Sequence, residues 1–408
     1  MNWIKRKFSN YIKPIVVYVY NSVVFFLSDK KKDTCIVLAD FDTYGGTRTY
    51  FEQICRFLND KNRRVICLVS ERQKDGAFLE LMQQLSFQYH VIPDKNGIVE
   101  HTEGWSWKLK AFYLRTLVND LNFFFSIFLK YNLNTLIISS GEAEKYLYLY
   151  WLPLKKLIYV LHTLPHRNIG KIGSYTLRKN LGRDKSIVAV SEFAKRSILK
   201  QWQIIPIDQQ YVHTVSNYFE PVTNNTLTRE KKDVVRILTI GHLVPYKNPL
   251  LWIEIAKSVL HKIGQKNIEF TWAGAGEQME KCSNEVRGYT NIKFIGYQKD
   301  VDELYASSDI YLQPSQIESQ GISVLGAMYY SLPCIVSNTG GLPESVVDEE
   351  SGYVIPNAVS DEYVEKILYL LQNEKFRIAM GIKGRKLFEE KFGKVHWTKK
   401  MNELLDIA

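Results

Sequence analysis

Residues 309–338 read DIYLQPSQIESQGISVLGAMYYSLPCIVSN, and their pattern decides the fold. An apolar run, DIYLQPS (309–315), is followed by a polar turn, a helical stretch that opens at Gly321, and a second apolar run, PCIVSN (333–338). Short apolar runs that alternate with helical stretches are typical of parallel strands joined by crossover helices. This stretch therefore predicts a strand–helix–strand unit of a parallel sheet.

The same alternation extends through most of the chain. Further apolar runs of strand length lie at 34–40, 63–70, 135–140, 156–162, 186–191, 234–242, 268–276 and 292–297. A polar segment with Pro221 and a charge run interrupts the alternation at 217–233 and is typical of a linker. We therefore expect an α/β fold with two Rossmann-like domains that face each other across a cleft.

Length and composition agree with this division. A chain of 408 residues is too long for one ordinary core, and 46% hydrophobic with 24% charged residues excludes a disordered or collagen-like protein. The scattered cysteines, without a C-x-x-C pair, argue against a disulfide framework or a zinc site. The expected parts are a basic and apolar segment (1–33), an N-terminal domain (34–216), a linker (217–233), a C-terminal domain (234–390) and a C-terminal helix (391–408).

The net charge of +10 is concentrated in two blocks. Residues 1–33 carry seven basic and two acidic side chains, and 155–200 carry eleven Lys and Arg against two acidic residues. Within the first block, the apolar run 14–27 is shorter than the ~20 residues of a membrane-spanning helix. It is interpreted as a core element, as an in-plane anchor whose lysines meet anionic headgroups, or as a true span. The second block suits an anionic polymer or headgroup as well as nucleic acid, but no nucleic-acid-binding motif accompanies it.

Candidate binding residues in 234–390 come directly after strands. Lys247 lies between a strand and a helix, where an ammonium group and free backbone N–H groups bind a diphosphate. Gly274 lies in the turn WAGAGE, and Glu318 lies in the polar turn of the opening stretch. The next helix begins with Gly321, Ile322 and Ser323, and its first amides can receive an anion or sugar hydroxyls.

From about residue 34 to 400, and most specifically across 237–356, the chain resembles the retaining glycosyltransferases of family 4, which have the GT-B architecture. The resemblance implies that the run GHLVPYK holds the donor pyrophosphate through Lys247, with His242 where arginine is usual. It implies that Glu318 lies at the donor sugar. Gly326 departs from the family, because a second glutamate that binds the nucleotide ribose usually stands there. Ribose recognition is therefore expected to be rebuilt, weakened or absent.

The N-terminal half resembles the family more weakly. There the resemblance implies that the turn Gly45-Gly46 lies by the acceptor and the phosphate, and that His162 contacts the donor sugar, a role His162 fits better than His166. Without the resemblance, a histidine at a strand end is more often a structural hydrogen-bonding residue. The run Asp40-Phe41-Asp42 has the D-x-D form that binds metal in the other large glycosyltransferase fold. Here it lies just before the Gly-Gly turn, where aspartates are common because they favour turns and caps.

The expected function is therefore retaining, metal-independent transfer of a sugar from a nucleotide-diphosphate donor to a lipid-linked or cell-surface glycan. The expected partners are this donor, the acceptor glycan and an anionic membrane surface, with no cofactor and no nucleic acid. The expected location is cytoplasmic, peripheral on the inner face of the cell membrane. Because of Gly326 and His242, a non-catalytic glycosyltransferase-like subunit that binds glycan or supports a partner enzyme is the alternative.

Overall fold

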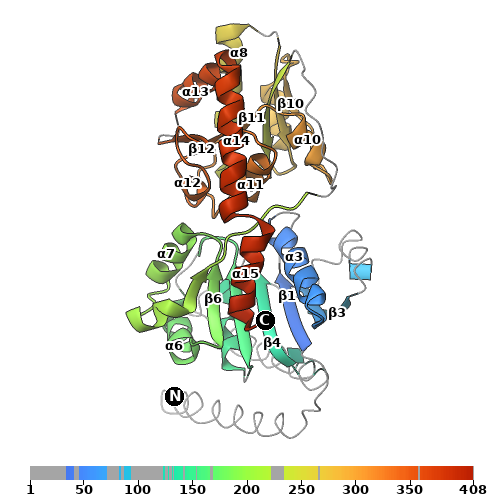
Figure 1. Ribbon diagram of the computed structural model, residues 1–408, viewed down its shortest axis with the longest axis vertical. Coiled ribbons are helices and arrows are strands. Elements are labelled where there is room, and N and C mark those ends of the chain that lie inside the picture. Colours follow the sequence, from blue (N-terminus) through green and yellow to red (C-terminus); the bar gives the residue numbers. More distant parts are fainter. Residues whose placement is uncertain are drawn as a thin grey trace, which may run out of the picture. The chain divides into compact units, whose positions relative to one another are not determined.

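The computed structural model describes residues 34–40, 46–70, 82–83, 87–92, 123–124, 127, 131, 133–140, 143–152, 154–165, 169–221, 234–264, 267–356 and 359–407. The chain divides into two compact units. Unit 1 runs to Ala189 and includes Lys195–His213, and unit 2 takes in Val190–Ala194 and the chain from Thr214. Figure 1 shows a sheet with helices in each of them. The proposed anchor within 1–33 lies outside the described residues.

Unit 1 is built on a seven-stranded sheet with the order β3-β2-β1-β4-β5-β6-β7. Its pairings from β3 to β6 are parallel. The strands are β1 (Thr34–Asp40), β2 (Arg64–Ser70), β3 (Gln88–Ile92), β4 (Leu133–Ser140), β5 (Lys156–Leu161), β6 (Lys185–Ala189) and β7 (Val212–Thr214). The helices are α3 (Gly46–Asp60), α6 (Gly170–Asn180), α7 (Glu192–Gln201) and the 3-10 helices η3 (Ala143–Trp151) and η4 (Pro206–Tyr211).

The central strands of unit 1 are apolar because both of their faces are covered. Every residue of β5 is buried, and so are the side chains of β1 from Thr34 to Ala39. Helix α3 turns Phe51, Ile54 and Leu58 inward, the spacing of one helical face. The cysteines of both units are buried and form no disulfide, which is typical of small core residues. They are Cys35, Cys55, Cys67, Cys282 and Cys334.

Unit 2 is built on a six-stranded sheet with the order β10-β9-β8-β11-β12-β13, in which every neighbouring pair is parallel. This is the strand order of a Rossmann fold. The strands are β8 (Val235–Ile240), β9 (Ile268–Ala273), β10 (Ile292–Phe294), β11 (Ile310–Gln313), β12 (Cys334–Ser337) and β13 (Gly352–Ile355). The helices are η5 (Pro245–Lys247), α8 (Pro249–Ile263), α9 (Met279–Glu285), α10 (Asp302–Ala306), α11 (Ile322–Tyr329), α12 (Leu342–Ser345), α13 (Ser360–Gln372), α14 (Glu374–Lys391) and α15 (Lys394–Leu405).

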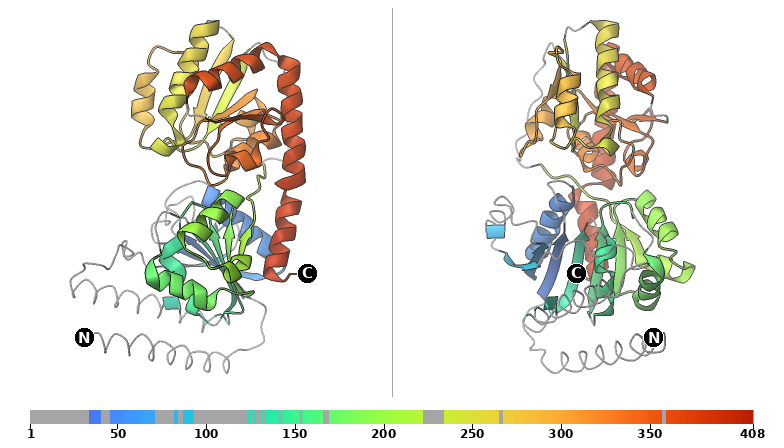
Figure 2. Two further views of the ribbon diagram at one scale, coloured as in Figure 1. Left: turned by 90° about the vertical axis from the view of Figure 1, so that its left-hand side faces the viewer. Right: turned by 180° about the vertical axis from the view of Figure 1, so that it is seen from behind.

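Two hydrophobic clusters cover the two faces of this sheet. Alternate strand residues such as Ile237 and Ile335 pack with α8, α9 and α13, whereas Leu238 and Val336 pack with α10, α11 and α14. Successive side chains of a strand point to opposite faces, so neighbouring residues of one strand belong to different clusters. Figure 2 shows helices on both sides of the sheet. The two sheets confirm the expected α/β fold with two Rossmann-like domains.

All the strands expected from the sequence are present, and over the described residues the sequence missed three further strands, β3, β7 and β13. All three are the outermost strands of their sheets. The expected linker 217–233 begins with Asn217 and Tyr218, which are buried in unit 2, and residues 222–233 lie outside the described residues. In the part of the chain that the structure describes, no helix combines the length and apolarity needed to cross a membrane.

Candidate functional site

The candidate site of unit 2 lies where the strand order reverses. Strands β8 and β11 are neighbours, and the chain leaves them in opposite directions along the sheet, toward β9 and β12 respectively. Ligands of open α/β sheets bind beyond the carboxyl ends of the strands at such a point. Lys247 follows β8 and Glu318 follows β11, so the topology alone brings these two predicted residues to one place.

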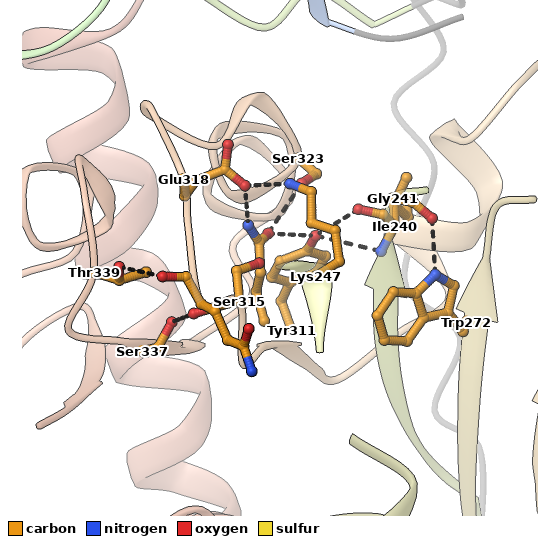
Figure 3. Close-up of polar contacts among 12 residues, drawn as sticks. Ile240, Gly241, Lys247, Trp272, Tyr311, Ser315, Glu318, Ser323, Ser337 and Thr339 are labelled. Atoms are coloured by element: carbon orange, nitrogen blue, oxygen red, sulfur yellow. Dashed lines mark hydrogen bonds and ion pairs between the residues drawn. The ribbon is translucent and has the colours of Figure 1, made fainter. Parts of the chain in front are cut away.

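Lys247 and Glu318 form an ion pair in which the Lys247 ammonium group donates to Oε2 of the carboxylate (Figure 3). Only 15% of the lysine side chain and 14% of the glutamate side chain are exposed. Because water screens this pair much less than a surface pair, the two charges attract each other strongly. The backbone also joins the two loops, since the Gln316 N–H donates to the Tyr246 carbonyl at 2.8 Å.

Gln313 is a second partner of Glu318 that the sequence analysis missed. Its Nε2 donates to Oε2 of Glu318 at 2.9 Å, and its Oε1 accepts from the Ser323 hydroxyl at 3.1 Å (Figure 3). Gln313 is the last residue of β11 and is 2% exposed. The sequence offered one signal for Gln313, a glutamine at the end of an apolar run, because a buried amide needs polar partners.

The loop after β8 is held by backbone contacts that leave no room for side chains. Gly274 has a φ of +149°, and a Cβ there would lie 2.0 Å from the Gly241 carbonyl oxygen. At Gly276 a Cβ would lie 2.4 Å from the Leu243 oxygen. The Trp272 indole N–H donates to the Gly241 carbonyl at 2.8 Å. Gly274, predicted to bind the donor, thus fixes the loop that carries His242.

Helix α11 begins at Ile322, four residues after Glu318. Gly321 precedes the helix with a φ of +93°, a left-handed conformation that favours glycine. Ile322 and Ser323 form the first helical positions, and amides in the first turn of a helix lack intrahelical acceptors. The Ser323 hydroxyl turns to Gln313 rather than capping the helix. The structure therefore gathers Lys247, Glu318 and the predicted residues 321–323 in one cluster.

At Gly326 the structure shows what replaces the expected glutamate. A Cβ at this position would lie 2.7 Å from Cζ and from the hydroxyl oxygen of Tyr305. The Tyr305 side chain is 1% exposed, and its hydroxyl donates to the Ser323 carbonyl at 2.8 Å. Burial raises the pKa of Tyr305 well above its ordinary value, so the phenol stays neutral and acts as a donor. An aromatic ring therefore fills the space into which any side chain at 326 would extend.

His162 lies at the carboxyl end of β5 in unit 1. One ring nitrogen, Nε2, is 3.0 Å from the Ser139 hydroxyl, and the ring packs edge-on against Tyr50 at 4.6 Å. Nδ1 is buried and has no hydrogen-bond partner among the described residues. Burial lowers the pKa of His162 to about 3, so the imidazole is neutral at physiological pH. It can then accept or donate one hydrogen bond to a bound ligand.

Other predicted residues of unit 1 are only partly described. Gly46 opens α3, whereas Gly45, Asp42 and His166 lie outside the described residues. Over the described residues no group of three or more His, Cys, Asp or Glu is placed to hold a metal ion.

The basic block 155–200 is divided in the structure, and two of its lysines point inward. Lys185 donates to the carbonyls of Tyr150 and Leu152, each at 2.6 Å, and Lys156 donates to the Arg183 carbonyl at 3.3 Å. Burial lowers the pKa of Lys185 to about 8, against the opposing effect of Asp184. These two charges support the fold and do not contribute to an open surface.

Comparisons with known proteins show a family similarity within unit 2. Residues 225–387 match the family model described as glycosyl transferases group 1. Residues 225–387 are therefore similar to the group 1 glycosyl transferases. The match covers the strands and helices that carry Lys247, Glu318 and Gly326, and it agrees with the resemblance seen in the sequence.

Two curated relatives have names that specify a polymeric or a lipid-linked acceptor. The poly(ribitol-phosphate) α-N-acetylglucosaminyltransferase of Staphylococcus aureus is 24% identical over 242 residues, 57% of this chain and 47% of its own length. The Escherichia coli UDP-Gal:α-D-GlcNAc-diphosphoundecaprenol α-1,3-galactosyltransferase is 27% identical over 169 residues, which are 39% of this chain and 44% of its own length. The chain spans about half the length of the curated relatives it matches.

A solved structure matches nearly the whole chain. The Anabaena HepE protein in complex with UDP-glucose superposes with a TM-score of 0.67 and 16% identity, and the match covers 92% of this chain and all of that one. At this identity the match shows the fold alone, and it confirms the GT-B architecture.

The contact at Gly326 predicts that a Gly→Ala substitution here lowers the stability of the fold, whereas the same change in a helix usually raises it. Gly→Ala inside a helix normally stabilises by about 0.5–1 kcal/mol, but Gly326→Ala forces a methyl group against Tyr305 and should destabilise the fold by roughly 1–3 kcal/mol. Gly384→Ala is the matched control, because Gly384 also lies in a helix and its Cβ would find no atom nearer than 3.5 Å. Urea unfolding measures both, and a Gly326→Ala variant as stable as Gly384→Ala contradicts the packing described.

Burial of neutral His162 predicts a loss of stability in acid. The folded chain keeps this imidazole unprotonated until about pH 3, whereas the unfolded chain binds a proton below about 6.5. The free energy of unfolding should therefore fall as the pH falls from 6.5 toward 3, by about 1.4 kcal/mol per pH unit from this group.

His162→Gln should make the loss of stability between pH 6.5 and 5 smaller than in the wild type. His261→Gln, at an exposed position of α8, serves as the control and should keep the wild-type pH dependence. Urea unfolding across this range tests the prediction, and equal slopes for both variants would argue against a buried neutral His162.

Proposed function

We propose that the chain is a retaining glycosyltransferase of family 4 that moves a sugar from a nucleotide-diphosphate donor to a lipid-linked or cell-surface glycan. The Lys247–Glu318 pair carries this proposal. It joins a cation suited to a diphosphate and a carboxylate suited to sugar hydroxyls at the switch point of a glycosyl transferase domain.

Lys247 is proposed to bind the donor diphosphate and to neutralise the charge that develops on it as the sugar leaves. A cation in a site shielded from water lowers the energy of such a transition state. His242, on the same loop after β8, is proposed to assist from the diphosphate side. Because this charge is supplied by side chains and amides, the proposed reaction needs no metal ion and no cofactor.

Glu318 and the amides of residues 321–323 are proposed to orient the donor sugar. The carboxylate accepts from sugar hydroxyls, and the first amides of α11 donate to oxygens of the sugar or phosphate. The neutral imidazole of His162 is proposed to contact the sugar as well. The bond between the anomeric carbon and the diphosphate oxygen then breaks, the acceptor oxygen bonds to that carbon on the same face, and the acceptor proton passes to the departing phosphate.

An anionic acceptor is proposed from the acceptors of two relatives and from the net positive charge of this chain. Relatives named above act on a ribitol-phosphate polymer and on a diphosphoundecaprenol-linked sugar, both anionic. The net charge of +10 favours acceptors and surfaces of that sign. We place the protein on the inner face of the cell membrane, as a peripheral protein of cell-envelope polysaccharide synthesis without a nucleic-acid partner.

The described surface of unit 1 has a basic and aromatic patch suited to such a membrane. The patch lies at the amino ends of β5 and β6, the edge of the sheet opposite His162. Its members are the exposed residues Lys155, Tyr175, Arg178, Lys179 and Arg183. Lys179 lies 6.0 Å from the Tyr175 ring, which contacts Trp151 at 6.1 Å. Cationic and aromatic side chains together favour anionic lipid headgroups.

A non-catalytic glycosyltransferase-like subunit is the second candidate, and Tyr305 is the observation that favours it. This ring occupies the space next to the backbone at position 326, where the family resemblance implies a ribose-binding glutamate. The substitution Gly326→Glu cannot decide between the candidates, because the new side chain would first displace Tyr305. Transfer or slow hydrolysis of a nucleotide sugar by the wild type excludes the non-catalytic candidate. Glycan binding without either reaction supports it.

A nucleotide-sugar screen tests the proposed function. UDP-glucose, UDP-galactose, UDP-N-acetylglucosamine and GDP-mannose are tested for protection against thermal unfolding and for release of nucleoside diphosphate. A donor at one hundred times its Kd should stabilise the wild type by about 2.7 kcal/mol. Lys247→Met should lose this protection and lower turnover by roughly 10²–10³. Lys257→Met, on α8, is the control and should behave as the wild type. Protection and turnover that survive Lys247→Met overturn the proposed site.

Vesicle binding tests the membrane proposal. Lys179→Glu with Arg183→Glu should weaken sedimentation with phosphatidylglycerol vesicles, and added salt should mimic the effect, since each basic residue contributes about 1 kcal/mol near an anionic surface. The control pair Lys375→Glu and Lys383→Glu makes the same change of charge on exposed positions of α14. Equal weakening by both pairs points to net charge alone and contradicts a specific patch.

A further inference from the structure

We propose that Gln313 is a positioning residue, which holds the Glu318 carboxylate in the orientation that receives the donor sugar. This inference rests on the proposed function of the same site. It extends that function to a residue on β11 that lies behind Glu318 and touches Glu318 rather than the ligand.

The hydrogen bonds of Gln313 fix the direction of its amide. The Ser323 hydroxyl donates to Oε1 at 3.1 Å, and the Tyr311 hydroxyl lies 3.0 Å from the same oxygen. Burial raises the pKa of Tyr311 well above its ordinary value, so this hydroxyl keeps its proton. With Oε1 held by hydroxyl donors, Nε2 must face Glu318, and it donates there at 2.9 Å (Figure 3).

The surroundings of Gln313 make this orientation rigid. Its side chain is 2% exposed, and Tyr311, which lies two residues before it on β11, is fully buried. Tyr311 is itself tied to β8, because the Ile240 N–H donates to the Tyr311 hydroxyl at 3.3 Å. A chain of contacts thus runs from the backbone of β8 through Tyr311 and Gln313 to the Glu318 carboxylate. Fully paired buried polar groups of this kind hold a single geometry.

Binding of a diphosphate changes which of the two partners Glu318 depends on. In the structure the carboxylate is held by Lys247 and by Gln313 on the same oxygen, Oε2. A diphosphate competes with Glu318 for the Lys247 ammonium group, since both are anionic acceptors. Once Lys247 turns to phosphate, the Gln313 amide is the contact that keeps Glu318 against the sugar. Loss of Gln313 should therefore weaken sugar recognition and spare diphosphate recognition.

The test compares two ligands on the same variants. Calorimetry gives the affinities of the tightest nucleotide sugar of the panel and of its parent nucleoside diphosphate. In Gln313→Leu the preference for the nucleotide sugar over the diphosphate should fall roughly ten- to hundredfold, the cost of one hydrogen bond to a charged group. Gln320→Leu is the matched control, because Gln320 is also 2% exposed and bonds Asn217, and its ligand preference should stay that of the wild type.

A second variant keeps the shape of the side chain and adds a pH readout. Gln313→Glu places a carboxylate against Glu318, and two adjacent carboxylates ionise together only at a cost that raises the pKa of one of them. The preference for the nucleotide sugar should therefore be lost near pH 8 and recover near pH 5, where a shared proton restores a donor. A merely structural role would not produce recovery in acid.

The outcomes separate this inference from the function on which it rests. Equal losses of nucleotide sugar and nucleoside diphosphate affinity in Gln313→Leu, or a pH-independent Gln313→Glu, overturn the role of Gln313 and leave the proposed function standing. A wild type that binds none of the nucleotide sugars overturns both. A selective loss in Gln313→Leu with recovery of Gln313→Glu in acid supports the inference.

Discussion

The adjacency of β8 and β11 at the switch point is the constraint on which the site depends. The two strands are separated by more than sixty residues of chain, yet their parallel pairing brings the loops of Lys247 and Glu318 together. A buried chain of hydrogen bonds locks this pairing, because the Trp252 indole donates to the Thr239 hydroxyl at 2.7 Å and that hydroxyl donates to the Leu312 carbonyl. Helix α8, β8 and β11 are thus joined directly beneath the charged pair.

Around this constraint, the candidate site of unit 2 is built largely from backbone and from buried polar side chains. Gly274 and Gly276 allow the loops after β8 and β9 to meet, and Gln313 and Ser323 orient Glu318 from below. Such a site is preorganised, since its groups are in place before a ligand arrives. At Gly326 the Tyr305 ring leaves no room for a Cβ, so the position where the family resemblance implies a glutamate has no side chain. Any recognition of ribose must therefore use other groups.

The sequence predicted what depends on local pattern and could not predict what depends on packing. Central strands such as β1 and β5 were visible as apolar runs because both of their faces are buried. Edge strand β3 was missed because its residues change from exposed to buried without a continuous apolar run. Lys247 and Glu318 were found from their places after strands. Gln313 and Tyr305 were missed, because their importance arises from contacts with residues distant in the chain, and no sequence pattern records those contacts.

A structure of the chain with a nucleotide sugar bound would show directly which groups hold this ligand, through its distances to Lys247 and Glu318. A phosphate oxygen should lie within about 2.7–2.9 Å of the Lys247 ammonium nitrogen. The sugar hydroxyls should contact Glu318, with Gln313 still bonded to that carboxylate and Tyr305 still beside Gly326. A diphosphate bound away from Lys247, with the Lys247–Glu318 pair intact, would contradict this arrangement.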